Sequence, residues 1–169
     1  MAVAELISAE QYLHTSFEHD AEFVGGRIVE RAAPRYEHAY LQAFLAGELR
    51  AVDRRLGLRI VTEQRVQIRP DRFRVPDVCV LTERPDDPFG RAIVTKPPYL
   101  CIEILSPEDT MAYTMEKVRE YLSFGVEWVW VIDPVSLSGQ VHSQNSVSDV
   151  EDKIFPTDRF SIDLSAVEF

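Results

Sequence analysis

Two carboxylates stand inside segments that are otherwise apolar, and they are the residues of this sequence best suited to chemistry. Asp77 lies in the strand-like segment Val75–Leu81, and Glu103 lies in Leu100–Leu105. A buried carboxylate is energetically costly unless it is paired with a cation or coordinates one. Since Mg²⁺ prefers oxygen ligands and often uses only one or two carboxylates, two such residues on neighbouring strands predict a hard-metal site.

Lys117 and Glu22 are two further charged residues that fit such a site. Lys117 lies on the helix predicted after the Glu103 strand, on one helical face with Tyr113 and Tyr121. From there its ammonium can reach a metal-bound water and stabilise charge on a phosphorane-like transition state. Taken singly, Lys117 also fits a solvated helix lysine, and Glu22 also fits a charge on an edge strand.

Asp77, Glu103 and His38 have structural interpretations as well. Asp77 could end a strand or pair with Arg74, and Glu103 could belong to a structural ion pair. His38, near the start of a long predicted helix, is expected to be exposed or to support the site, with a catalytic role as the alternative. The functional prediction therefore depends on the combination and order of these residues.

The elements that must position these residues alternate between helices and strands. Leucines recur at helical spacing from Leu41 to Leu56, and Gly25-Gly26 between two apolar runs is typical of a hairpin turn. We expect helices over Ala9–Phe17, Tyr36–Leu56 and from Ser106 to Gly125, a hairpin over Glu22–Glu30, and strands over Arg59–Ile68, Val75–Leu81, Tyr99–Leu105 and Val126–Asp133. Weaker strands are expected near Gln140–Gln144 and Lys153–Phe155, and loops over Arg84–Gly90 and Ser136–Asp149.

This order of elements predicts a mixed α/β domain that occupies residues 1–169 as one unit. Hydrophobic residues make up 46% of the chain and charged residues 27%, which excludes a disordered protein. No apolar run approaches the ~20 residues of a membrane span. Two cysteines and an N-terminus without a basic segment lead us to expect a cytoplasmic protein.

The formal net charge of −10 argues against a general coat for nucleic acids, because a phosphate backbone repels such a surface. It does not exclude a nuclease, because some of the acids are proposed metal ligands. A basic approach surface would have to come from a local cluster of arginines. The best candidates for substrate binding are Arg65, Arg69, Arg72 and Arg74.

Several segments resemble a known family. They are Arg-Val-Pro-Asp-Val (Arg74–Val78), Pro98–Pro107, Glu116–Val126, Trp-Val-Ile-Asp-Pro (Trp130–Pro134) and the N-terminal Glu-Phe-Val-Gly-Gly-Arg-Ile-Val (Glu22–Val29). Together they resemble a large bacterial family of restriction-endonuclease-like proteins within the PD-(D/E)XK nuclease superfamily. The resemblance implies a restriction-endonuclease-like core with a central mixed sheet flanked by helices, plus an N-terminal hairpin.

The resemblance also implies roles for individual residues. Asp77 and Glu103 would be the acidic ligands of Mg²⁺ (or Mn²⁺), and the backbone carbonyl of Ile104 would supply a further oxygen. The usual motif lysine falls at Leu105, so its role would pass to Lys117. Secondary candidates are Glu22, as a further ligand or orienting group, and His38, where the family often has histidine.

The prediction is thus a metal-dependent nuclease acting on DNA, with Asp77, Glu103 and Lys117 as catalytic residues. The family often carries basic residues and an aspartate at Thr110–Tyr113, and Asp-Gly at the hairpin turn, and this chain has neither. The alternative is therefore a catalytically inactive nuclease fold that serves as an interaction or regulatory module. A homodimer is also expected, because nucleases that cut both strands are mostly dimers and the C-terminal half is unusually rich in aromatic residues. These are Trp128, Trp130, Phe155, Phe160 and Phe169.

Overall fold

A mixed β-sheet forms the centre of the protein. The computed structural model describes residues 6–17, 20–31, 33–85 and 93–169. Within these residues the central sheet has six strands in the order β10-β9-β8-β7-β6-β3. They are β3 (Arg59–Thr62), β6 (Val78–Leu81), β7 (Leu100–Ile104), β8 (Trp128–Ile132), β9 (Gly139–Ser143) and β10 (Val147–Val150). The β7–β8 pair is parallel and its neighbours are antiparallel.

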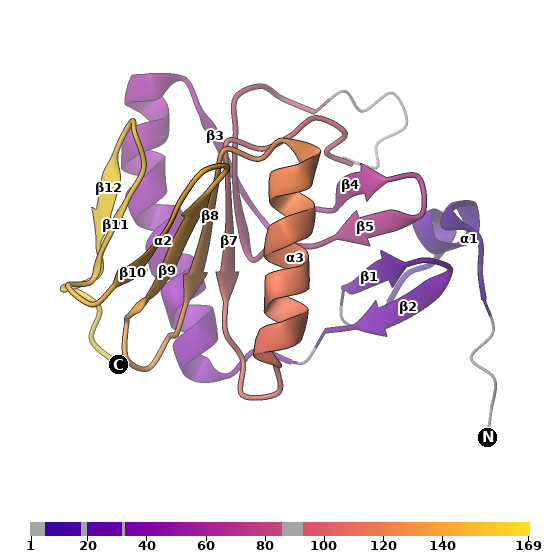
Figure 1. The fold of residues 1–169 in the computed structure, drawn as a ribbon, viewed down its shortest axis with the longest axis horizontal. Helices are drawn as coiled ribbons and strands as arrows, with labels where there is room; N and C mark the ends of the chain where they lie inside the picture. The colour runs from indigo at the N-terminus through magenta and orange to yellow at the C-terminus, as the bar shows by residue number, and fades with distance from the viewer. Residues whose placement is uncertain (1–5, 18–19, 32, 86–92) are drawn as a thin grey trace.

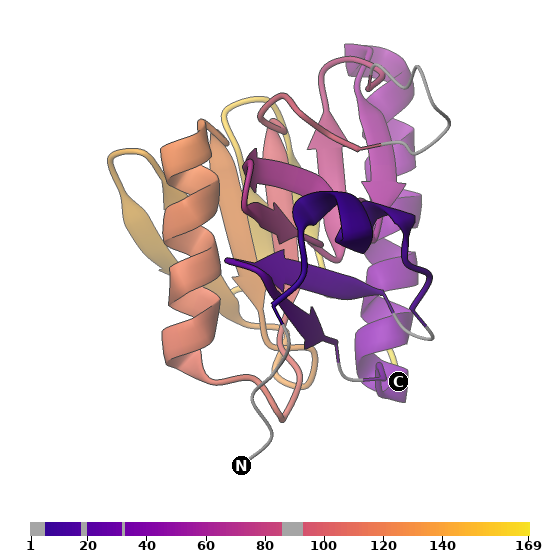
Figure 2. The same ribbon diagram turned by 90° about the vertical axis from the view of Figure 1, so that its right-hand side faces the viewer.

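Two helices cover opposite faces of this sheet (Figures 1 and 2). Helix α2 (Tyr36–Leu56) buries a leucine stripe against one set of strand residues, which includes Val78 and Ile102. Helix α3 (Met111–Phe124) packs on the alternate set, which includes Cys79 and Cys101. Side chains along a strand alternate between faces, so neighbouring strand residues enter different cores. A small hairpin of β11 (Ile154–Pro156) and β12 (Ser161–Asp163) joins the core on the α2 side.

A second sheet lies between α3 and α2 in Figure 2. In the described residues it has the order β2-β1-β5-β4, from β1 (Ala21–Val24), β2 (Arg27–Glu30), β4 (Val66–Arg69) and β5 (Arg72–Arg74). The short helix α1 (Ala9–His14) packs on it through Tyr12, which meets Phe23 and Phe73 at ring-centroid distances of 5.3 Å each. Strand β1 of this sheet carries Glu22, whose side chain contacts Lys117 and Tyr113 of α3.

The expected fold class is confirmed, as are the N-terminal hairpin and the extent of α2, which ends at Gly57 in the left-handed conformation. The strand expected over Arg59–Ile68 is wrong. Glu63 has a φ of 51°, and the chain turns there, so β3 joins the central sheet while β4 joins the second. The weaker strand expected near Gln140–Gln144 is confirmed as β9, whereas the loop expected over Ser136–Asp149 is wrong for most of its length, which belongs to β9 and β10.

Helix α3 begins four residues later than the sequence suggests. Ser106 was expected as its cap, but the side chain of Thr110 caps the helix by accepting a bond from Tyr113 N at 3.3 Å. Asp109 Oδ2 accepts instead from Ser106 N at 2.8 Å and closes a local turn. A loop therefore separates β7 from α3, and its residues line the candidate site. Helix α1 likewise ends at His14 rather than Phe17, and part of the expected loop Arg84–Gly90 lies outside the described residues.

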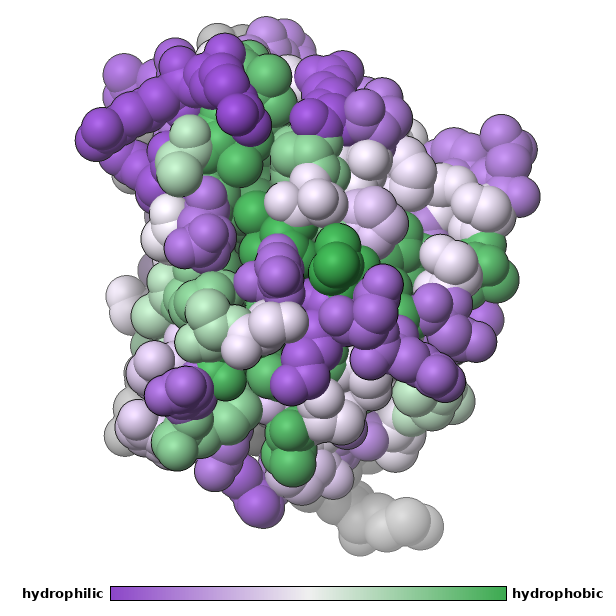
Figure 3. Space-filling view, turned by 90° about the vertical axis from the view of Figure 1, so that its left-hand side faces the viewer, coloured by the Kyte–Doolittle hydropathy of each residue, from purple (hydrophilic) through white to green (hydrophobic). Residues whose placement is uncertain are grey.

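The aromatic C-terminal half is mostly accommodated within the chain itself. Trp130, Phe155 and Phe160 are buried in the core on the α2 side, whereas Phe169 is half exposed. The outer face over α2 and the C-terminal hairpin intersperses hydrophobic with hydrophilic side chains (Figure 3). The number of aromatic residues therefore no longer argues for a dimer. No helix in the described part of the chain is both long and apolar enough to cross a membrane.

Candidate active site

Strand pairing brings Asp77 and Glu103 together at one end of the central sheet. Val78 pairs with Ile102 in the antiparallel β6–β7 ladder, so the next pair of positions outward is Asp77 and Glu103. Asp77 directly precedes β6 rather than lying within it, and its Oδ2 accepts a hydrogen bond from Ile104 N at 2.7 Å. The two carboxylates predicted from the sequence as a pair are thus neighbours, although each is almost fully buried.

The second oxygen of Asp77 faces two basic groups. Oδ1 accepts from the guanidinium of Arg31, and His38 Nε2 lies 3.4 Å away. Burial alone would raise the pKa of Asp77, but the hydrogen bond from His38 and the charge of Arg31 lower it below its ordinary value. Asp77 is therefore ionised at neutral pH. His38 is buried, contrary to the exposed position that the sequence allowed, and among the described residues its Nδ1 has no hydrogen-bond partner.

Glu103 is held by two residues of α3. Its Oε2 accepts from Lys117, and its Oε1 accepts from the Tyr121 hydroxyl at 2.6 Å. Burial raises the pKa of Glu103 to about 7, although the Lys117 ammonium acts in the opposite direction. Lys117 itself is only 8% exposed, so it is not the solvated helix lysine that the sequence also allowed. The predicted helical face thus does carry Lys117 and Tyr121 to the Glu103 carboxylate.

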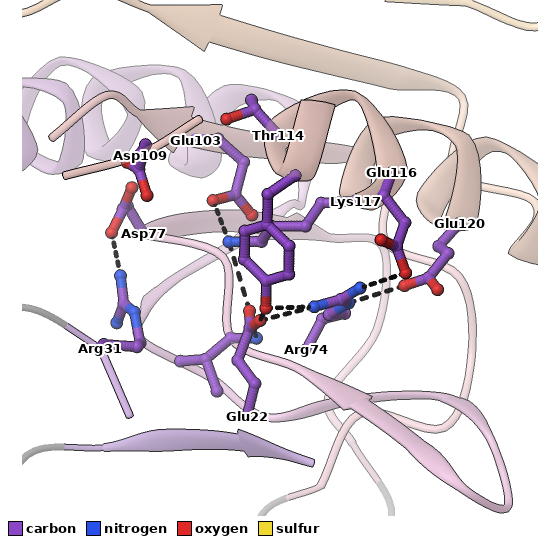
Figure 4. A network of polar contacts seen from close by, with 12 residues as sticks. Glu22, Arg31, Arg74, Asp77, Glu103, Asp109, Thr114, Glu116, Lys117 and Glu120 are labelled. Carbon is purple, nitrogen blue, oxygen red and sulfur yellow. Dashed lines mark hydrogen bonds and ion pairs between the residues drawn. The ribbon is translucent and has the colours of Figure 1, made fainter. Parts of the chain in front are cut away.

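Glu22 lies on the other side of Lys117. Its Oε1 is 3.2 Å from Lys117 Nζ, and its Oε2 accepts from Arg74 and from the Tyr113 hydroxyl, both at 2.7 Å. Burial alone would raise the pKa of Glu22, but Lys117 and Arg74 lower it to about 2. Glu22 is therefore a permanent anion beside Lys117 (Figure 4).

Arg74 is fully buried in an ion network that joins β1, β5 and α3. Besides Glu22 it contacts Glu120 at 2.6 Å and Glu116 at 3.4 Å. Arg72 shares Glu120 and Glu116, at 2.6 and 3.0 Å. Neither arginine is free to meet a phosphate, and Arg74 does not pair with Asp77.

The remaining two predicted substrate-binding arginines lie on the second sheet and the turn before it. Arg65 is mostly buried, pairs with Asp20 at 3.0 Å and stacks over Tyr12. Arg69 is half exposed and lies 3.6 Å from Asp71. None of the four predicted arginines lines the cleft beside Asp77 and Glu103.

The cleft above these residues has a volume of about 530 Å³ and is strongly acidic. Among its described lining residues, Arg31 and Lys117 are the permanently charged cations. The lining carboxylates are Asp20, Glu22, Glu30, Glu63, Asp77, Glu103, Glu108 and Asp109. A phosphate that enters this cleft therefore needs additional positive charge close to Asp77 and Glu103.

Sequence reasoning missed Arg31. It follows β2 directly and lies 46 positions before its partner Asp77, with no motif around it. The one available signal was indirect: a buried aspartate needs a cationic partner, and the sequence does not show which residue supplies it. Tyr113 and Tyr121 were visible on the helical face of Lys117, but their hydroxyl partners could be known only from the fold.

Comparisons with known proteins agree with this architecture. Residues 9–167 match the model of the Uma2 family, described as "Putative restriction endonuclease". The chain is similar to the crystal structure of a "putative nuclease belonging to DUF820" from Anabaena variabilis ATCC 29413, with a TM-score of 0.76 and 24% identity. That match covers 89% of each chain and shows a shared fold. No match was found among curated proteins.

Proposed function

The chain belongs to the Uma2 family of restriction-endonuclease-like proteins, and we propose that it is a metal-dependent nuclease that hydrolyses phosphodiester bonds of DNA. Family membership supports a nuclease. Within it, we assign metal binding to Asp77, Glu103 and the carbonyl of Ile104, and activation of the attacking water to the same site together with Lys117. The observation that carries the proposal is the convergence of Asp77, Glu103 and Lys117 at one cleft.

The donor set fits a hard divalent cation. Two carboxylates, one directly before β6 and one within β7, line one cleft, and two cations, Arg31 and Lys117, already compensate their charge there. The described residues contain no group of three or more His, Cys, Asp or Glu side chains arranged to hold a metal. Backbone oxygen and water would complete the coordination, as Mg²⁺ commonly requires. When bound, the metal would lower the pKa of a water and stabilise negative charge on the phosphate.

Lys117 and Glu22 act as a unit in this proposal. The ammonium of Lys117 is held between Glu22 and Glu103, and these two carboxyl groups raise its pKa, so it stays protonated. In that position it would donate a hydrogen bond to the attacking water or to a phosphate oxygen and so orient the in-line attack. Glu22 is a positioning residue in this scheme, because its side chain fixes the ammonium without needing to contact the substrate.

An inactive nuclease fold is the second candidate, and one observation favours it. Both central carboxylates have cationic partners, Arg31 and Lys117, and the cleft around them is acidic. A protein that kept the fold for interaction with another partner could retain these pairs as structural ion pairs. Titration with Mn²⁺ by calorimetry separates the two: binding that Asp77→Asn abolishes supports the enzyme, and no binding at millimolar metal supports the inactive module.

The direct test is Mg²⁺-dependent cleavage of plasmid DNA by the wild type and by Glu103→Ala. The variant should lose at least ~100-fold in rate, because loss of one electrostatic group at a reacting centre commonly costs that much. Glu108→Ala is the matched control, since Glu108 lines the same cleft but pairs with the exposed Arg35. Undiminished cleavage by a folded Glu103→Ala protein would refute the assignment.

A homodimer and a cytoplasmic location belong to the same proposal. Two copies would place one site on each strand of a duplex. Equilibrium sedimentation that gives a monomer in the presence of Mg²⁺ and duplex DNA would remove the dimer from the proposal without affecting the site.

A further inference from the structure

Arg31 combines three features: partial exposure, a position on the cleft wall and a single close carboxylate partner. Its side chain is 20% exposed, it lines the cleft, and its one close carboxylate partner is Asp77. Glu63 lies farther away, at 3.9 Å, and is itself half exposed. Arg74, in contrast, has no exposed surface and contacts three carboxylates and a tyrosine hydroxyl.

Arg31 donates to the same oxygen of Asp77 that a metal ion would need as a ligand. Asp77 Oδ2 is already used by the backbone amide of Ile104, at 2.7 Å. Oδ1 is therefore the oxygen of Asp77 that faces cations, and the Arg31 guanidinium donates to it (Figure 4). A divalent cation and a guanidinium repel each other and cannot both take the same carboxylate oxygen at full strength. Metal binding at Asp77 should then displace Arg31.

The displaced guanidinium remains among acids. The basic side chains lining the described part of the cleft are Arg31 itself, His38 and Lys117, and the acidic ones are carboxylates, so a phosphate is the new anion that the reaction brings there. A guanidinium presents a planar fork of donors that matches two phosphate oxygens, and such charge-assisted bonds are among the stronger ones. Arg31 is anchored directly after β2, at the wall of the cleft that faces Asp77.

We propose that Arg31 has two successive partners: it neutralises Asp77 in the metal-free protein and binds the scissile phosphate once metal has taken its place. This inference rests on the proposed nuclease function and names the residue that contacts the substrate. It predicts opposite effects of one substitution. Removing the guanidinium should strengthen metal binding, because a competitor is lost, and should weaken substrate binding, because a phosphate ligand is lost.

The test uses the whole protein and four forms of it: wild type, Arg31→Gln, Arg31→Lys and Arg35→Gln. Arg35 is the matched control, because it lies near the same cleft mouth and pairs with Glu108 but does not touch Asp77. Calorimetric titration with Mn²⁺ alone gives metal affinity. Fluorescence anisotropy of a labelled duplex oligonucleotide in Ca²⁺, and KM with plasmid DNA in Mg²⁺, give substrate binding.

Arg31→Gln should bind Mn²⁺ about 3- to 10-fold more tightly than wild type, as expected when a competing state is removed. Its KM should rise on the order of 10-fold, the usual cost of one charge-assisted hydrogen bond. Arg31→Lys should keep the competition for Asp77 and recover part of the substrate affinity. Arg35→Gln should leave Mn²⁺ affinity unchanged. Thermal melting adds a readout independent of activity, because Mn²⁺ should stabilise Arg31→Gln more than it stabilises the wild type.

Equal or weaker Mn²⁺ binding by a folded Arg31→Gln protein would overturn the inference about Arg31 and leave the proposed function standing. The same holds if Arg31→Gln and Arg35→Gln raise KM equally. A wild type that binds no Mn²⁺ and cleaves no DNA would overturn the proposed function, and this inference with it.

Discussion

Two groups of buried ion pairs stand side by side in this protein, and they differ in what surrounds them. The cleft pairs, Asp77–Arg31 and Glu103–Lys117, border an open cavity of about 530 Å³. The Arg74 network, formed by Arg74 with Glu22, Glu116, Glu120 and Tyr113, lies between the second sheet and α3. Arg74 at its centre has no solvent contact.

The residues of the cleft pairs can exchange their partners for a ligand, whereas the residues of the Arg74 network cannot. Arg74 has several anionic partners, so removing any one leaves it compensated. Asp77 is bonded to one guanidinium, that of Arg31, with His38 beside it, and Glu103 is bonded to Lys117. The pKa of Glu22, shared by the network and Lys117, is lowered to about 2, whereas burial raises that of Glu103 to about 7. A buried carboxylate beside a cavity with few cations is a candidate for function, and one in a saturated network is a candidate for structure.

The largest expected effect is structural and concerns the Arg74 network. Arg74→Met leaves Glu22, Glu116 and Glu120 near one another without their central cation, and breaking a buried charge group commonly costs about 3–5 kcal/mol. Urea denaturation should therefore show a large loss in the free energy of unfolding. Arg50→Met is the control, because Arg50 is mostly exposed on α2. If Arg74→Met unfolds no more easily than Arg50→Met, the network does not hold the second sheet to α3.

Lys117→Met should lower the rate of cleavage without weakening metal binding. Loss of the ammonium removes the group proposed to orient the attacking water, so cleavage should fall about 100- to 1000-fold. Mn²⁺ affinity should be retained or increased, because a cation that competes for Glu103 is gone. Lys96→Met is the control, since Lys96 is exposed and pairs with Glu83. Cleavage at the wild-type rate by Lys117→Met would show that Lys117 is structural.

Metal binding should depend on pH through the cleft pairs. The pKa of Glu103 is about 7, so below that pH a metal must displace a proton, and Mn²⁺ affinity should fall by about tenfold per pH unit. Above pH 7 the affinity should level off. Calorimetry in buffers of different ionisation enthalpy measures the proton release directly. An affinity that stays constant between pH 5.5 and pH 8 would contradict metal binding to Glu103.

Glu103 and Glu22 should contribute to the free energy of unfolding with opposite dependences on pH, measured without added metal. A carboxyl whose folded pKa is raised from 4.5 to about 7, as for Glu103, stabilises the fold below pH 4.5 and loses that contribution as the pH rises through 7. Glu22, lowered to about 2, stabilises the fold above pH 4.5 and loses that contribution as the pH falls toward 2. Glu103→Gln should therefore flatten the profile between pH 4.5 and pH 7 and leave the acid limb intact.

The smallest expected effects come from two tyrosines of α3. Tyr121→Phe removes the hydroxyl bound to Glu103, and Tyr113→Phe removes the one bound to Glu22 and Arg74. Each loss should cost about 1 kcal/mol in urea denaturation, the typical worth of one hydrogen bond. Cleavage and Mn²⁺ affinity should change only for Tyr121→Phe. If Tyr113→Phe has the larger effect on Mn²⁺ affinity, the Arg74 network takes part in metal binding and its separation from the cleft pairs is wrong.

Local patterns in the sequence predicted the parts of the fold that local forces determine. The leucine spacing located α2 with both ends, and alternation in β7 placed Glu103 on the face that α3 covers. The break at Glu63 and the start of α3 at Thr110 were missed, because each depends on turn geometry that several residue types can adopt.

The long-range pairs of the site were only partly predictable. Lys117 could be placed near the site because it lies on the helix that follows the Glu103 strand, and the resemblance to a family pointed to the same lysine. Arg74 was expected on a basic surface, but its carboxylate partners come from β1 and α3, more than 40 positions away. Arg31 meets Asp77 across a similar separation. Such pairings are set by how the two sheets pack, and the residues near each partner carry no sign of them.

The most direct test of the central claim is anomalous diffraction from crystals of the protein equilibrated with Mn²⁺. We predict one manganese peak in contact with Asp77 Oδ1 and the carboxylate of Glu103, with the carbonyl of Ile104 as a further ligand and with Arg31 moved away from Asp77. Crystals saturated with Mn²⁺ that show no peak there, and Arg31 and Lys117 still bonded to the two carboxylates, would contradict it.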